Sequence, residues 1–132
     1  MTQEDKELLI KDLCARIPYG VKFYFDGVRH IIIGVYKGLD SYVEVANGMR
    51  YHIESIKPYL FPMSSMTEEQ KREYNKWKHD IPVCRYEYGD VIEEIELYDS
   101  LESFEYLIEN HFDYRGLIEK GLAIDATDKN IY

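Results

Sequence analysis

Alternation of apolar and polar positions between residues 21 and 53 is the clearest pattern in the chain. Apolar-alternating runs are separated there by the turn sequences Asp26-Gly27, Gly38-Leu39-Asp40-Ser41 and Asn47-Gly48. Asx-Gly pairs accept the positive φ angles of a two-residue hairpin turn, so the flanking strands are expected to pair antiparallel. The sequence therefore predicts a small antiparallel β-meander.

Strict alternation assigns the strand residues to two faces of this sheet. The predicted core face holds Val21, Phe23, Phe25, Ile31, Ile33, Val35, Val43, Val45, Met49, Tyr51 and Ile53. The opposite face is aromatic and mostly basic, with Ile32 and Glu44 among its residues. We take seven residues of that face as the candidate binding surface: Lys22, Tyr24, His30, Tyr36, Tyr42, Arg50 and His52.

Three helices are predicted by periodicity and by residues suited to helix starts. Thr2 is placed to cap a helix over 3–16, whose apolar face would hold Leu9, Ile10, Leu13, Cys14 and Ile17. Thr67 to Gln70 has the spacing of a capping box, which predicts a helix from 67 to about 78. A third helix is predicted over 100–110, whereas 91–97 fits a strand or a helix equally well.

These elements predict an α+β fold. An N-terminal helix and the β-meander, ending in one short helical turn, form a module over 1–62. The meander curls into a small SH3-like barrel or stays a bent open sheet under the helix. Residues 63–132 form a mainly helical part packed on this module as a single cooperative domain, and 111–132 is too apolar to be free.

Composition narrows the class of protein. A net charge of −9 over 132 residues disfavours general nucleic-acid binding. The sequence has no 18-residue apolar run, and it opens on a charged amphipathic helix instead of a signal peptide, so we expect a cytoplasmic protein without a membrane partner. Cys14 and Cys84 are isolated, which fits a reducing compartment, and we expect both to be small buried hydrophobes.

Residue patterns for catalysis or cofactor binding are not found. The histidines His30, His52, His79 and His111 lack metal-ligand spacing, so no metal and no cofactor is predicted. The serines lie in turns and helix starts without a nearby base, and the acidic runs are typical of solvated faces. We therefore predict no catalytic residue, which favours a non-enzymatic role without settling it.

Three blocks of the sequence carry a family resemblance. They are DLCARIPYGVK at 12–22, IKPYLFPMSSMTEE at 56–69 and HFDYRGLIEKGLA at 111–123. In these blocks the chain resembles a group of uncharacterised small proteins of gut Bacteroidales genomes and their phages. The resemblance spans both ends of the chain, with a variable region near 75–100. It implies a phage or mobile-element context and a cytosolic location, and it supplies no activity.

The sequence thus favours a protein that acts through protein–protein contacts or self-association, as a modulator of a host factor. The alternative is a small-molecule or nucleotide binder, with rings stacking on a base and Lys22, Tyr24, His30, Arg50 and His52 supplying the contacts. A third interpretation gives this face no binding role: the C-terminal half covers the tyrosines and turns the face into a second small core.

Overall fold

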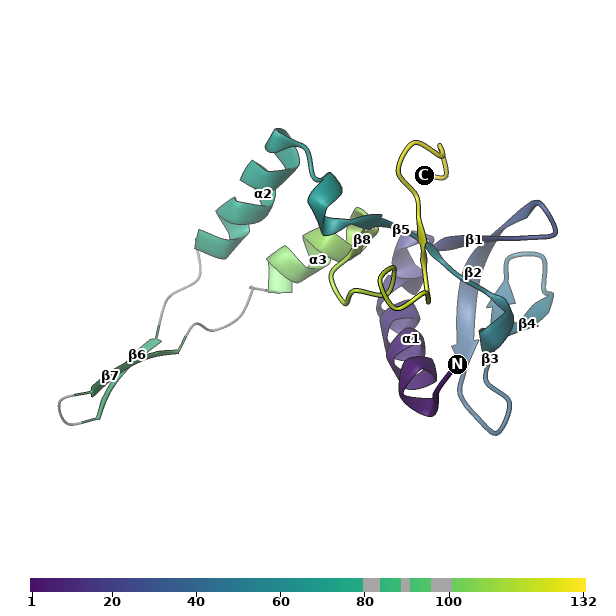
Figure 1. Ribbon diagram of the computed structural model, residues 1–132, viewed down its shortest axis with the longest axis horizontal. Helices are drawn as coiled ribbons and strands as arrows, with labels where there is room; N and C mark the ends of the chain where they lie inside the picture. Colours follow the sequence, from purple (N-terminus) through teal and green to yellow (C-terminus); the bar gives the residue numbers. More distant parts are fainter. Residues whose placement is uncertain (80–83, 89–90, 96–100) are drawn as a thin grey trace. The chain divides into compact units, whose positions relative to one another are not determined.

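The computed structural model describes the backbone of residues 1–79, 84–88, 91–95 and 101–132, and the side chains of 1–74 and 104–132 (Figure 1). Two compact units are present, 1–65 with 108–132 and 66–107. The helices are α1 (Gln3–Arg16), α2 (Glu68–His79) and α3 (Leu101–Glu109), with 3-10 turns η1 (Ile17–Tyr19), η2 (Ile53–Ser55) and η3 (Met63–Ser65). The strands are β1 (Lys22–Phe25), β2 (Val28–Tyr36), β3 (Tyr42–Val45), β4 (Arg50–His52), β5 (Tyr59–Pro62), β6 (Cys84–Tyr88), β7 (Val91–Ile95), β8 (Phe112–Asp113) and β9 (Ile124–Asp125).

Local hydrogen bonds confirm the predicted helix starts and turns. The Thr2 hydroxyl accepts the Asp5 N–H at 3.0 Å, and α1 covers the predicted span. Asp26 and Gly27 both have positive φ angles, 50° and 75°, as the two-residue turn between β1 and β2 requires. The predicted short helical turn after the meander is η2.

A curled four-stranded antiparallel sheet, in the order β1-β2-β3-β4, confirms the β-meander and the α+β class. Helix α1 covers its inner face (Figure 1), so Leu9 and Leu13 pack with Phe23, Val43 and Val45. All five side chains are fully buried. The outer face of the sheet is the one turned away from α1.

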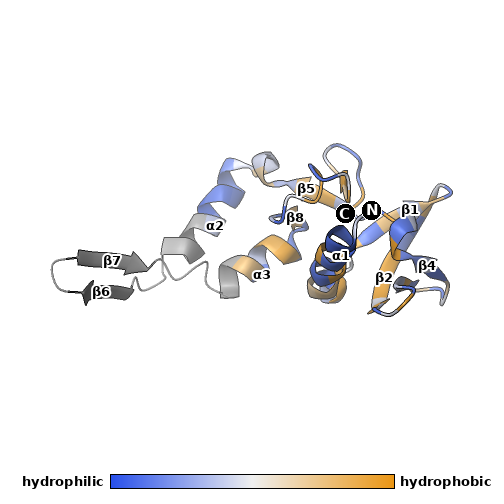
Figure 2. Ribbon diagram, turned by 60° about the horizontal axis from the view of Figure 1, so that its bottom comes forward, coloured by the Kyte–Doolittle hydropathy of each residue, from blue (hydrophilic) through white to orange (hydrophobic). Residues whose placement is uncertain are grey.

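A β-bulge in β2 overturns part of the predicted face assignment. Ile32 pairs with Val45 and Gly34 with Glu44, so two steps along β2 match one step along β3. Ile32 is therefore buried, whereas Ile31 and Ile33 are 38% and 50% exposed, the reverse of the prediction. After the bulge the alternation is restored, and Val35 packs against the core as predicted. Figure 2 shows β2 as a largely hydrophobic strand.

Two further positions of the predicted core are wrong. Met49 is 53% exposed because it lies in the turn before β4, where its N–H donates to the Asn47 side chain. Cys14 is exposed on α1, because the buried side of this helix runs through Asp12 and Arg16 instead. The side chain of Cys84 lies outside the described residues.

The expectation of a mainly helical C-terminal half is also wrong. Residues 84–88 and 91–95 form an antiparallel hairpin, which assigns most of the ambiguous 91–97 segment to a strand. After α3, β8 and β9 both pair parallel with β5. Leu117, Leu122 and Ala123 join the core of the first unit, as the apolar character of 111–132 predicted.

Helix α2, in the second unit, begins with the predicted capping box. The Thr67 hydroxyl accepts the Gln70 N–H at 3.2 Å, and the Gln70 side chain accepts the Thr67 N–H at 2.9 Å. Two backbone donors that the first turn of a helix leaves unpaired are satisfied in this way. The helix then runs over Glu68–His79, close to the predicted 67–78.

Candidate functional site

Two tyrosines and an arginine form a cluster on the outer face of the sheet. Tyr36 and Tyr42 face each other across β2 and β3, and their rings stack with centroids 4.8 Å apart and planes 19° apart. The Arg50 guanidinium lies over both rings, 5.6 Å from the Tyr36 centroid and 4.9 Å from that of Tyr42. Cation–π contacts of this kind orient an exposed arginine.

Glu44 links the members of this cluster from its centre. Its carboxylate accepts the Tyr36 hydroxyl at 3.2 Å and lies 3.9 Å from the Arg50 Nε. The negative charge of Glu44 raises the pKa of Tyr36, so that hydroxyl stays a donor at neutral pH. The Arg50 side chain is nevertheless 58% exposed, which leaves its outer N–H groups accessible.

Gly34 makes room for the cluster. A Cβ built at this position would lie 3.2 Å from the Tyr36 ring, so the ring folds back across the glycine. Close approach of an aromatic ring is one reason for a glycine inside a strand. Together with the exposed Ile31 and Ile33 on the same strand, these residues form a surface that we call the outer patch: Ile31, Ile33, Tyr36, Tyr42, Glu44 and Arg50.

His30 was predicted on this face, and that placement is wrong. It precedes the bulge and points inward, where its ring lies 5.3 Å from that of Phe23 and 5.1 Å from that of Tyr51. The Tyr51 hydroxyl is 3.3 Å from its Nε2. His30 is therefore a buried part of the core rather than a surface contact.

Lys22 and Tyr24 lie elsewhere, next to the C-terminal segment. The Tyr132 hydroxyl accepts the Lys22 N–H at 2.9 Å and donates to the Tyr59 carbonyl at 2.8 Å. The Lys22 ammonium donates to the Ile131 carbonyl, and the Tyr24 ring packs edge-on against Tyr59. The C-terminal segment thus occupies this end of the predicted surface, whereas Tyr36, Arg50 and His52 are exposed and Tyr42 is half-buried.

Sequence reasoning missed a buried ionic cluster in the first unit. Asp12 and Arg16 are fully buried and form an ion pair with the Arg16 Nε 2.7 Å from the Asp12 carboxylate. Arg16 also donates to the Phe112 carbonyl at 2.6 Å, and Arg115 contacts Asp12 at 3.2 Å. The spacing of four residues on a helix favours the ion pair. The partners from 112 and 115 are too distant in sequence to predict.

His111 lies beside this cluster and stacks on Tyr132, with ring centroids 3.5 Å apart. Burial, together with the charges of Arg16 and Lys22, lowers the pKa of His111 to about 4. Burial likewise raises the pKa of Tyr132 to about 12, although the hydrogen bond from the Lys22 N–H acts in the opposite direction. Both rings are therefore neutral at pH 7, and they connect the C-terminal segment to β1 and β5.

In the described parts of the chain, no three histidine, cysteine or acidic side chains come together in a way that could hold a metal ion. None of the helices within these residues is long and apolar enough to cross a membrane. Comparisons with protein-family models, with curated proteins and with solved structures gave no match.

Proposed function

We propose that this protein acts without catalysis, by binding a protein partner through the outer patch. The observation that carries the proposal is the ordered Tyr36–Tyr42–Arg50 cluster beside exposed isoleucines. Tyrosine and arginine are the residue types that contribute most to binding at protein interfaces. Rings and a guanidinium that are already fixed lose little side-chain entropy when a partner binds.

The placement of the other predicted residues favours protein contact over nucleotide binding. The nucleotide alternative needs Lys22 and His30 beside Arg50, but Lys22 contacts the C-terminal segment and His30 is buried. The members of that set still exposed are Tyr24, Arg50 and His52, and Tyr24 packs against Tyr59. A surface of isoleucines and stacked tyrosines suits an apolar protein contact better than a phosphate.

We also propose that this is a phage or prophage protein of the bacterial cytoplasm that modulates a host factor. This proposal rests on the resemblance of the three sequence blocks. The SH3-like barrel remains a proposal as well. It is supported by the curled meander ending in the 3-10 turn η2.

The double variant Tyr36→Ala/Arg50→Ala tests the contact surface. Exposed substitutions change stability by about 0.5 kcal/mol or less, so the melting temperature should stay close to that of the wild type. Self-association in sedimentation, or the partner profile in affinity capture from host lysate, should be lost. The control is Lys11→Ala, which removes one exposed cation from α1. A stable double variant with unchanged association and partner profile would show that the outer patch is not the contact surface.

A further inference from the structure

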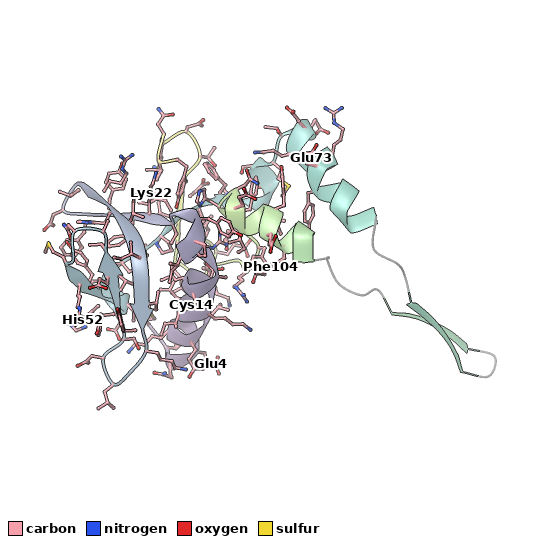
Figure 3. The ribbon with its side chains drawn as sticks, turned by 180° about the vertical axis from the view of Figure 1, so that it is seen from behind. Glu4, Cys14, Lys22, His52, Glu73 and Phe104 are labelled. Carbon is pink, nitrogen blue, oxygen red and sulfur yellow. The ribbon has the colours of Figure 1, made fainter. Side chains whose placement is uncertain are left out.

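Strand β4 is an open edge of the four-stranded sheet. Backbone hydrogen bonds from the Ile53 N–H to the Ser41 carbonyl and from the Val45 N–H to the Met49 carbonyl lie at the two ends of the β3–β4 pairing. Hydrogen-bonded and non-hydrogen-bonded pairs alternate along an antiparallel ladder, so Arg50 and His52 lie at non-hydrogen-bonded positions. The N–H and the carbonyl of Arg50 and the N–H of His52 therefore point away from β3. Within the described residues, these three groups have no hydrogen-bond partner. Arg50 and His52 are both exposed, and Figure 3 shows His52 on the side of the sheet away from α1.

At the opposite edge of the sheet, strand β1, an outward backbone N–H has a hydrogen-bond partner. There the Tyr132 hydroxyl accepts the outward N–H of Lys22. An edge strand with free N–H and C=O groups is a template for another strand, and proteins commonly cover or cap such edges. Edge β1 is capped at this position, whereas β4 presents its groups next to the outer patch.

The charge beside β4 indicates what kind of strand would fit. Strand β4 carries Arg50, whose side chain stays 58% exposed. Arg50 already contacts Glu44 on the neighbouring strand β3, its cross-strand partner. A strand added on the other side of β4 would place a second side chain opposite Arg50, on the same face. A carboxylate at that position would accept the outer N–H groups of the guanidinium.

We propose that β4 binds an extended acidic segment of a partner protein by strand addition, with backbone hydrogen bonds to Arg50 and His52 and a carboxylate on Arg50. The inference rests on the proposed function and meets the outer patch through Arg50. Apolar side chains at alternate positions of the added strand would lie toward the core-facing side, since side chains alternate along a strand. Recognition of this kind takes affinity from the main chain and specificity from side-chain pairs.

The probe is a fluorescein-labelled heptapeptide of alternating valine and glutamate, compared with the same peptide carrying lysine in place of glutamate. Binding is followed by anisotropy and by amide shifts in ¹⁵N NMR spectra. We expect the glutamate peptide to bind, to shift the amides of β4 and to weaken with added salt. Arg50→Gln should weaken it about tenfold or more, since a charge-assisted hydrogen bond is lost.

The decisive variant is His52→Pro with His52→Ala as its control. His52 has φ −61° and ψ 141°, a conformation that proline adopts without strain, so His52→Pro removes one edge N–H and should leave the fold intact. The melting temperatures of both variants check this. We expect His52→Pro to weaken the glutamate peptide about tenfold relative to His52→Ala.

Each contrary result overturns a defined part of the inference. Equal binding of the glutamate peptide by the two His52 variants excludes strand addition. If Tyr36→Ala/Arg50→Ala nevertheless loses binding, the outer patch is still the contact surface. Equal binding of the lysine peptide excludes the carboxylate. If no peptide binds at about millimolar concentration, the acidic partner segment is rejected. If the wild type self-associates and His52→Pro does not, the acidic partner segment is rejected in favour of a second copy of the chain.

Discussion

Removing the charge of Asp12 should destabilise the first unit strongly, because Arg16 would keep its charge in a fully buried position. In Asp12→Asn, Arg16 retains the Phe112 carbonyl as an acceptor but loses its counter-ion. Removal of one partner from a buried ion pair costs about 3–5 kcal/mol. With a urea m value of about 2 kcal/mol/M, the unfolding midpoint should fall by about 1.5–2.5 M.

Companion variants separate this explanation from a simple loss of packing. Arg115→Met should cost less than Asp12→Asn, since Asp12 would still be paired with Arg16 and no fully buried charge would lose its counter-ion. The double variant Asp12→Leu/Arg16→Met should be more stable than Asp12→Asn, because the fully buried charge of Arg16 is removed together with its counter-ion, while Arg115 loses its ion pair with Asp12 in both variants. It still leaves the Phe112 carbonyl without its donor, which costs about 1–3 kcal/mol.

The assay is equilibrium urea unfolding followed by tyrosine fluorescence and by far-UV circular dichroism, whose transitions should coincide if unfolding is two-state. A midpoint shift of less than about 0.5 M in Asp12→Asn would contradict this account of the buried ion pair, since it is well below the shift expected for an unpaired buried charge. A double variant less stable than Asp12→Asn would contradict it as well, because the ion pair would then not be the origin of the loss.

The pKa of His111 is lowered from 6.5 to about 4, so only the unfolded chain gains its proton as pH falls through this window, and stability should fall. Asparagine tolerates the φ of 63° at this position, so urea unfolding should show a smaller loss of stability on acidification in His111→Asn than in the wild type. Gly34→Ala should displace the Tyr36 ring and remove its nuclear Overhauser contacts to Tyr42, and unchanged contacts would contradict the cluster geometry. Thr67→Ala should destabilise the start of α2 by about 0.5–2 kcal/mol, visible as faster amide exchange in its first turn.

Features held by short-range hydrogen bonds could be predicted from the sequence. The limits of α1, the turn at Asp26-Gly27 and the capping box at Thr67 depend on residues a few positions apart. Their backbone conformations follow from local geometry, whatever the rest of the chain does. Tyr42 and Arg50 of the outer patch were found in the same way because alternation holds in β3 and β4, and Tyr36 because it lies after the bulge in β2.

The faces of β2 required the tertiary structure. Gly34 marks an irregular position in a strand, and an isolated glycine there is compatible with a bulge. Which residue becomes the extra one depends on how β2 pairs with β3, so Ile31 and His30 were assigned to the wrong faces. A shift of one residue exchanges the two faces of a strand, and local sequence does not fix it.

The buried cluster and the edges of the sheet also depend on residues distant in sequence. Asp12 and Arg16 are four apart on α1, but their burial relies on Phe112 and Arg115, about a hundred positions away. Edge β1 is likewise capped by Tyr132, and β5 finds parallel partners in β8 and β9. The sequence alone determined the local elements and the tyrosines and arginine of the outer patch. Only the tertiary structure decided which charges are buried and which edge is open, because both depend on pairing between segments that no local pattern specifies.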